Sequence, residues 1–174
     1  MKYNMTILKK SIGMLALAWG IPSSMVAQNQ GSHLMIAMGG AYPRTLESTI
    51  SYEKEMLYHN AWEYFATYSI QYDEDPEAKH ITRKSFWHNH NTWGVGAVYK
   101  PCVGRGRNHH GSLRIGASAG SDFHKAIGAV HVGYEHTYNL YDGWSVFFAI
   151  KEDISIRGKD RFKTGFNLGA KIPL

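Results

Sequence analysis

The sequence has a single cysteine and few charged residues, and beyond its N-terminal segment it has no long apolar run. Cys102 is the single cysteine among 174 residues, which excludes a disulfide framework and a cysteine-based zinc site. Charged residues make up 19% of the chain, a low share for a protein whose entire surface faces water. Beyond the N-terminal segment no stretch of roughly 18 apolar residues occurs, so no membrane-spanning helix is expected there. Apolar residues nevertheless reach 44%, which excludes a wholly disordered chain.

Residues 1–27 predict a cleaved secretory signal peptide. Lys2, Lys9 and Lys10 precede the apolar stretch 12–21 (IGMLALAWGI), and Ala27 is a suitable last residue before the cleavage site. A membrane anchor is the alternative, but about ten apolar residues are too few when a spanning helix needs roughly 20. Residues 28–174 are then expected to form an exported, single-domain protein. Loss of the three lysines lowers the net charge from +5 to +2, which weakens the electrostatic case for nucleic acid.

The remaining chain shows alternation of apolar and polar residues. Between Phe162 and Leu174, six of seven residues on one parity are apolar, and the other parity holds no large hydrophobic residue. A period of two is typical of a strand with one apolar face. Similar patterns predict eight strands, over residues 34–42, 46–56, 62–72, 92–100, 112–120, 126–138, 144–153 and 162–174. Their even number and their length predict an all-β fold, an eight-stranded antiparallel outer-membrane β-barrel.

The residues at the polar positions of the alternating strands favour this barrel over a soluble one such as a lipocalin. These positions are rich in glycine, serine, threonine and asparagine, which suit the narrow interior of an eight-stranded barrel better than a water-facing surface. The apolar parity places tryptophan and tyrosine near strand ends, as interfacial girdles require. Seven charged residues of the polar parity are expected to form a paired, structural network that leaves no pore: Glu63, Arg114, Glu135, Lys151, Asp153, Lys163 and Lys171.

An even strand count also predicts the orientation. Both termini are expected in the periplasm. The turns at 58–60, 101–110 and 139–143 would then face the periplasm and partner proteins. The loops at 73–84 and 157–160 would face the outside.

Two serine motifs carry possible chemistry. Residues 116–120 (GASAG) match the G-x-S-x-G nucleophile elbow, but that motif needs a strand-to-helix turn, and here an alternating strand continues without a helix. Ser118 and His131 on the next strand remain as a hypothesis of a lipid-cleaving pair.

The other reactive residues favour structural interpretations. His88 and His90 share a face and His109 and His110 are adjacent in a predicted turn, but none has a third ligand at a recognisable spacing. Residues 104–107 (GRGR) are expected to form a basic turn near lipid phosphates or peptidoglycan, and Cys102 is expected to be an inert buried thiol. We therefore expect no catalytic, cofactor-binding or metal-binding residue.

Four segments resemble the conjugal transfer protein TraO family. They are residues 35–40 (MIAMGG), 114–120 (RIGASAG), 132–135 (VGYE) and 162–174 (FKTGFNLGAKIPL), and residues 167–174 also resemble a C-terminal signal for outer-membrane insertion, with Leu174 in place of the usual aromatic residue. The resemblance covers nearly all of residues 28–174 at the level of strand order, but not 73–84 or 101–110.

The resemblance implies an accessory or structural role in a conjugal DNA transfer apparatus. It implies an outer-membrane protein without enzymatic activity, whose partners are membrane lipid and other conjugal transfer proteins. Direct binding of nucleic acid or of a small-molecule substrate is not expected. The alternative is a stand-alone barrel that acts as a surface adhesion protein or a lipid-modifying enzyme.

Overall fold

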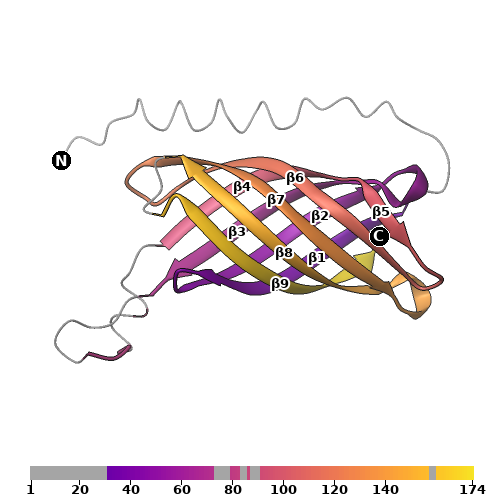
Figure 1. Cartoon of the computed structure of the whole chain (residues 1–174), viewed down its shortest axis with the longest axis horizontal. Coiled ribbons are helices and arrows are strands. Elements are labelled where there is room, and N and C mark those ends of the chain that lie inside the picture. Colours follow the sequence, from indigo (N-terminus) through magenta and orange to yellow (C-terminus); the bar gives the residue numbers. More distant parts are fainter. Residues whose placement is uncertain (1–30, 73–78, 83–85, 87–90, 157–159) are drawn as a thin grey trace.

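The computed structural model describes residues 31–72, 79–82, 86, 91–156 and 160–174. Eight long antiparallel strands close into a barrel (Figure 1). They are β1 (Ser32–Tyr42), β2 (Thr45–Glu55), β3 (Ala61–Gln71), β4 (Asn91–Lys100), β6 (His109–Ser121), β7 (Ala126–Asn139), β8 (Ser145–Ile156) and β9 (Phe162–Pro173). The short β5 (Cys102–Arg105) follows β4 after Pro101 and also pairs with β6.

Strand pairing leaves no long open edge. Neighbouring strands follow the order β4-β3-β2-β1-β9-β8-β7-β6, and the pairing of β4 with β6 closes the ring. Closure satisfies the backbone hydrogen bonds between strands, which a lipid environment demands. The predicted all-β, eight-stranded antiparallel barrel is thus confirmed.

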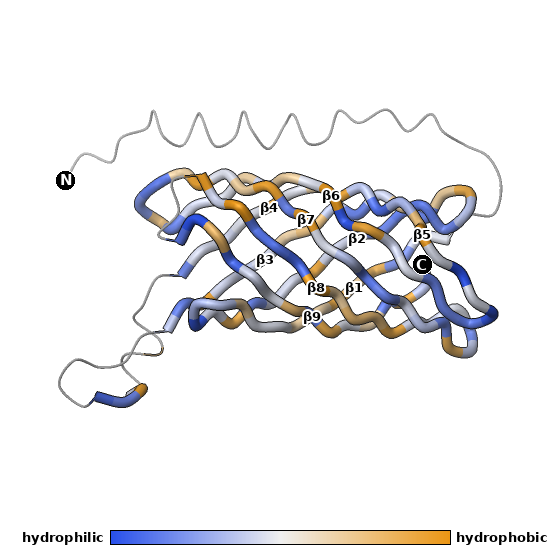
Figure 2. Tube along the Cα trace, in the orientation of Figure 1, coloured by the Kyte–Doolittle hydropathy of each residue, from blue (hydrophilic) through white to orange (hydrophobic). Residues whose placement is uncertain are grey.

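The outward face of every long strand carries apolar side chains. Ile36 of β1 is 49% exposed and Leu168 of β9 is 57% exposed, although both lie in the middle of their strands. Their inward neighbours Met35, Ala37 and Asn167 are buried. Figure 2 shows this alternation of apolar and polar residues along the strands. Such a continuous apolar surface is unfavourable in water but matches the hydrocarbon of a bilayer.

The two ends of the barrel differ in what they carry. The terminal end, at the right of Figure 1, holds Ser32, Pro173 and the turns β2–β3, β5–β6 and β7–β8. Two of these turns are short 3₁₀ segments, η1 (Leu57–His59) and η2 (Tyr141–Gly143). The distal end holds the turns β1–β2 and β6–β7.

The predicted turn at residues 101–110 is wrong in its extent. Residues of β5 and β6 pair across most of it, for example Cys102 with Ser112 and Arg105 with His110. The turn itself occupies only residues 106–108, where the Gly106 amide donates a hydrogen bond of 2.8 Å to the His109 carbonyl oxygen. Glycine and arginine suggested a loop, but cross-strand backbone pairing extends the hairpin through them.

Several sequence predictions concern residues outside the described ranges. The predicted signal peptide, His88, His90 and most of the predicted loops at 73–84 and 157–160 are among them. Within the part of the chain that the structure describes, no helix is both long and apolar enough to cross a bilayer.

Candidate functional site

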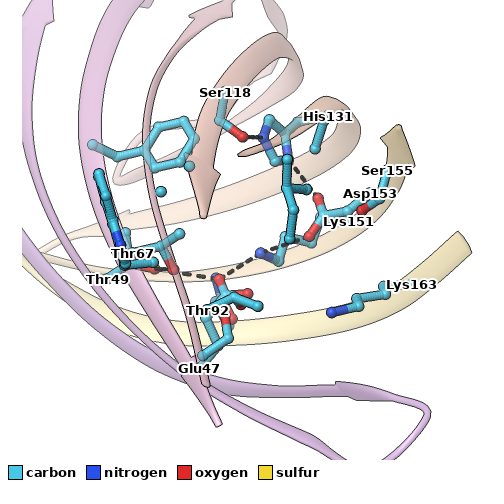
Figure 3. Close-up of a pocket in the computed structure, with 18 of the residues that line it drawn as sticks. Glu47, Thr49, Thr67, Thr92, Ser118, His131, Lys151, Asp153, Ser155 and Lys163 are labelled. Atoms are coloured by element: carbon cyan, nitrogen blue, oxygen red, sulfur yellow. Dashed lines mark hydrogen bonds and ion pairs between the residues drawn. The ribbon is translucent and has the colours of Figure 1, made fainter. Parts of the chain in front are cut away.

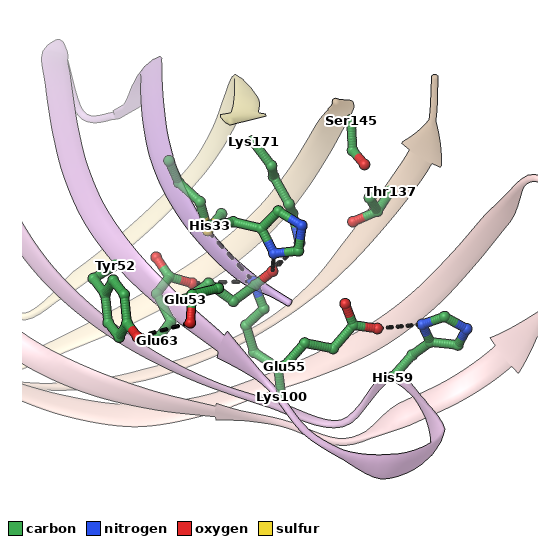
Figure 4. A network of polar contacts seen from close by, with 12 residues as sticks. His33, Tyr52, Glu53, Glu55, His59, Glu63, Lys100, Thr137, Ser145 and Lys171 are labelled. Atoms are coloured by element: carbon green, nitrogen blue, oxygen red, sulfur yellow. Dashed lines mark hydrogen bonds and ion pairs between the residues drawn. The ribbon is translucent and has the colours of Figure 1, made fainter. Parts of the chain in front are cut away.

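Six charged side chains meet inside the half of the barrel nearer the terminal end. We name this group the ionic plug, and Figure 4 labels its members Glu53, Glu63, Lys100 and Lys171. It comprises three carboxylates and three cations from six different strands: Glu53 of β2, Glu63 of β3, Lys100 of β4, Arg114 of β6, Glu135 of β7 and Lys171 of β9.

Lys100 lies at the centre of the ionic plug. Its ammonium is 2.7 and 2.9 Å from the two carboxylate oxygens of Glu135 and 3.2 Å from Oε2 of Glu63. It also forms an ion pair with Glu53. The side chain is 2% exposed, so its charge is removed from water almost completely. Three carboxylates around one ammonium match its three donor hydrogens.

The other two cations complete the pairing. Arg114 Nη1 lies 2.8 Å from Oε2 of Glu63 and also bonds Glu135. Lys171 Nζ lies 2.8 Å from one oxygen each of Glu53 and Glu135. Equal numbers of carboxylates and cations balance the charge, which is the condition under which buried ions are tolerated.

The ionic plug separates two cavities. The distal cavity, about 110 Å³, reaches from Arg114 of the plug to Asp122 in the β6–β7 turn. The terminal cavity, about 230 Å³, is lined by Lys171 of the plug and by His33, His59 and other residues of the terminal end. Each cavity thus ends on the plug.

The distal cavity contains a hydrogen-bonded chain of serine, histidine and aspartate (Figure 3). Ser118 Oγ lies 2.7 Å from Nε2 of His131, and the other ring nitrogen, Nδ1, lies 2.6 Å from Oδ1 of Asp153. The three residues come from the adjacent strands β6, β7 and β8. This is the order of contacts in a nucleophile–base–acid triad. We name these three residues the lumen triad.

Strand register builds the lumen triad. His131 lies directly opposite Asp153 in the β7–β8 pair, so the two side chains meet on the inner face. On the other side, the residue opposite His131 is Gly116 of β6, which has no side chain. The imidazole therefore has room to reach Ser118, the next inward residue of β6.

Neighbouring residues hold the triad in place. The ring of Phe65 meets the imidazole of His131 edge-on at 5.4 Å between centroids. Lys151 Nζ lies 3.1 Å from Oδ2 of Asp153 and also pairs with Glu47. A Cβ added to Gly96, which lies opposite Ser118, would be 2.7 Å from both Phe65 Cζ and Ser118 Cβ. The glycine thus leaves the space that the two side chains fill.

The predicted lumen network is confirmed in part and divided by the structure. Glu63, Arg114, Glu135 and Lys171 belong to the ionic plug, whereas Lys151 and Asp153 form a second cluster with Glu47. Lys163 lines the distal cavity. Sequence reasoning missed Glu47, Glu53 and Lys100 as partners, although each has the inward parity of its strand.

The serine hypothesis gains a geometric basis. Ser118 and His131 do lie within hydrogen-bonding distance, and Asp153 is an additional member that the sequence analysis did not connect with them. Residues 116–120 lie inside β6, so the nucleophile elbow is absent here, as the alternation predicted.

The remaining candidates within the described ranges, His109, His110 and Cys102, lie at the terminal end. His109 and His110 are strand residues of β6 rather than turn residues. Within the described ranges, no group of three or more His, Cys, Asp or Glu side chains is arranged to hold a metal ion. Cys102 is half-buried with Sγ 3.4 Å from the Gly104 carbonyl oxygen, so the expectation of a buried thiol is wrong. It lies on the short β5, which pairs with only one neighbour, β6.

The basic segment 104–107 also differs from its prediction. Arg105 belongs to β5, and its guanidinium donates a hydrogen bond to the Tyr58 carbonyl oxygen. The same guanidinium carbon lies 5.2 Å from the centroid of the Tyr58 ring. Arg105 therefore ties the β5–β6 hairpin to the β2–β3 turn.

Comparison with known proteins supports the fold. No protein-family model and no curated protein matches the chain. A solved de novo designed transmembrane β-barrel is similar, with a TM-score of 0.51 and 8% identity, over 85% of this chain and all of the designed one. At that identity the similarity concerns the fold alone. Fold, apolar outer face and charged interior together define an eight-stranded transmembrane β-barrel protein.

Proposed function

We propose that the protein is a non-conducting outer-membrane barrel that serves as an accessory, structural component of a conjugal DNA transfer apparatus. One observation carries the non-conducting part: the buried ion pairs of the ionic plug lie between the two cavities, with Arg114 lining one and Glu53 and Lys171 lining the other. An ion that entered either cavity would have to break buried ion pairs to pass, which is energetically costly. The contribution of the barrel to transfer is then anchoring and docking rather than transport.

Two further observations support this role. The TraO-like segments at 35–40, 114–120, 132–135 and 162–174 lie on β1, β6, β7 and β9, so they cover strands from both sides of the barrel. The apolar outer face supports membrane lipid as one partner.

The terminal end is the surface that we assign to other conjugal transfer proteins. With an even strand count this end faces the periplasm. Its turns expose Leu57, Tyr58, Leu140 and Tyr141, and Tyr141 is 92% exposed. Exposed apolar and aromatic side chains on turns are typical of contact surfaces between proteins.

Deletion of the gene followed by mating tests the role in transfer. We expect transfer frequency to fall in the deletion strain and to recover on complementation with the wild-type chain. The paired substitution Leu140→Asp and Tyr141→Asp should fail to complement while it still reaches the outer membrane. Unchanged transfer in the deletion strain would contradict the proposal.

Cell fractionation tests the location independently. The wild-type chain and the Leu140→Asp, Tyr141→Asp variant should both be recovered with the outer membrane and migrate faster on gels before heating than after. A purely soluble periplasmic protein would contradict the outer-membrane assignment.

A further inference from the structure

We propose that the lumen triad is a serine-hydrolase site that cleaves short-chain carboxylic esters admitted from the distal end of the barrel. This activity goes beyond the structural role proposed above and does not depend on it. It departs from the expectation of a protein without enzymatic activity.

The contacts match the roles that the chemistry requires. In the tautomer that carries its proton on Nδ1, His131 donates to Asp153 Oδ1 at 2.6 Å and accepts from the Ser118 hydroxyl at 2.7 Å. The acceptor nitrogen is then directed at the hydroxyl proton, as a general base must be. Asp153 fixes the tautomer, and Lys151 holds its second oxygen at 3.1 Å.

Each step of the reaction balances with these three residues and water. The Ser118 oxygen attacks the ester carbonyl carbon while its proton moves to His131 Nε2. Collapse of the tetrahedral intermediate breaks the ester bond, and His131 protonates the departing alcohol. A water molecule then attacks the acyl-serine, gives a proton to His131 and releases the carboxylic acid. His131 finally returns that proton to Ser118.

Positive charge in the same cavity suits the intermediate. Backbone amides of barrel strands are used in pairing, so side chains must stabilise the oxyanion. Lys163 of β9 lies opposite Asp153 in the strand register and lines the same cavity. Figure 3 shows its side chain on the cavity wall together with Lys151. We assign charge stabilisation to Lys163, since Lys151 is already paired with Glu47 and Asp153.

The size and position of the distal cavity determine which esters can reach Ser118. The cavity volume is about 110 Å³. A dry engineered cavity of roughly 150 Å³ holds benzene, so an acyl group of a few carbons fits inside this cavity, whereas most of a fatty acyl chain would have to lie outside it. The triad also faces the lumen, whereas its sequence neighbours Val130 and Val132 face the bilayer. Acyl chains of the surrounding lipid are therefore separated from Ser118 by the barrel wall.

A purely structural triad is the competing interpretation. Serine, histidine and aspartate inside a barrel satisfy one another's hydrogen bonds without any reaction. The two interpretations differ in one property, because only a catalytic Ser118 reacts covalently with an acylating or phosphonylating reagent.

The test uses the full mature chain folded in detergent. Hydrolysis of p-nitrophenyl acetate is compared with that of p-nitrophenyl palmitate, and a fluorophosphonate probe is used to label the nucleophile, located by mass spectrometry. We expect faster cleavage of the acetate and labelling at Ser118. Ser118→Ala should lower acetate hydrolysis on the order of a thousandfold or to the uncatalysed rate.

Ser112→Ala is the matched control. Ser112 is a buried serine on the same strand as Ser118, and it does not line the distal cavity, so its loss leaves both the triad and the proposed ester site unchanged. Its hydrolysis should equal that of the wild type. Heat-modifiable migration verifies folding of every variant, and labelling of the wild type decides the matter if Ser118→Ala fails to fold.

Two results would overturn the proposal. A folded wild-type protein that shows neither Ser118 labelling nor hydrolysis above that of Ser118→Ala has a structural triad only. Palmitate hydrolysis faster than acetate hydrolysis would overturn the assignment to short-chain esters.

Discussion

Lys100 of β4 reaches past β6 to Glu135 of β7, and its ammonium contacts both oxygens of that carboxylate at 2.7 and 2.9 Å. The contact joins strands that are not neighbours in the barrel. The lumen is thus held together by side chains as well as by the backbone pairing of its wall. A single substitution at this contact is therefore expected to lower the stability of the barrel strongly.

Lys100→Met should destabilise the barrel strongly. The change leaves Arg114 and Lys171 as the two plug cations for the three carboxylates Glu53, Glu63 and Glu135, so one buried negative charge loses its compensation. Removal of one member of a buried ion pair costs about 3–5 kcal/mol. Urea unfolding in detergent, followed by heat-modifiable migration, measures the change in the free energy of unfolding.

Lys54→Met is the control for Lys100→Met. Lys54 lies on β2 but is exposed, and surface substitutions change the unfolding free energy by about 0.5 kcal/mol or less. Equal stability of the Lys100→Met variant and the wild type would show that the ionic plug does not stabilise the barrel.

The wild-type barrel should carry no steady ionic current. Both cavities end on the ionic plug, so no continuous water path is expected through the lumen. Recording from planar lipid bilayers with the purified protein measures this directly. Removal of two plug side chains, in Lys100→Ala with Glu135→Ala, removes one charge of each sign and should allow a small leak. Stable conductance steps from the wild type would contradict the closed lumen.

The alternation of apolar and polar residues predicted which side chains face the lumen and which face lipid. It could do so because a shift of one residue in register would expose every lumen residue to lipid. Where a short hairpin joins two strands, the position of its turn also predicts which residues of the two strands lie opposite each other. Asn139 pairs with Ser145 across the β7–β8 turn, and eight residues from each of them stand His131 and Asp153. The pairing of His131 with Asp153 could therefore be predicted once the position of the turn was known. Alternation alone does not pair His131 with Asp153, because the pairing also requires a count of residues outward from the turn along both strands.

Contacts between strands that are not neighbours could not be predicted in this way. Whether Lys100 meets Glu135 depends on the tilt and stagger of the strands around the whole ring, which no local pattern encodes. The β5–β6 pair adds a register shift between Cys102 and Gly104. Sequence reasoning could therefore place charges in the lumen but could not assign their partners.

Gly96→Val should crowd the triad. A Cβ at this position would lie 2.5 Å from the Ala117 carbonyl oxygen and 2.7 Å from both Phe65 Cζ and Ser118 Cβ, so the backbone of β6 as well as the two side chains must shift. Overpacking of this kind costs about 1–3 kcal/mol. We expect a folded but less stable barrel in which acetate hydrolysis and Ser118 labelling are lost.

Gly104→Val is the control for Gly96→Val, because no atom lies within 4 Å of a Cβ added to Gly104. Its stability, hydrolysis and labelling should equal those of the wild type. If Gly96→Val retains full hydrolysis, Ser118 does not act inside this cavity.

A charge on the outer face should be costly only where the face meets the centre of the bilayer. Leu168 stands mid-way along β9 between Met38 of β1 and Phe148 of β8, and it is 57% exposed. Leu168→Arg should lower the free energy of unfolding in lipid vesicles by about 2–4 kcal/mol, the usual cost of arginine at the midplane. Ile156→Arg, at the distal end of β8, should cost only about 0–1 kcal/mol because that position lies near the interface. Denaturant titration of both variants in the same vesicles measures the two values. Equal costs at the two positions would mean that Leu168 does not face hydrocarbon.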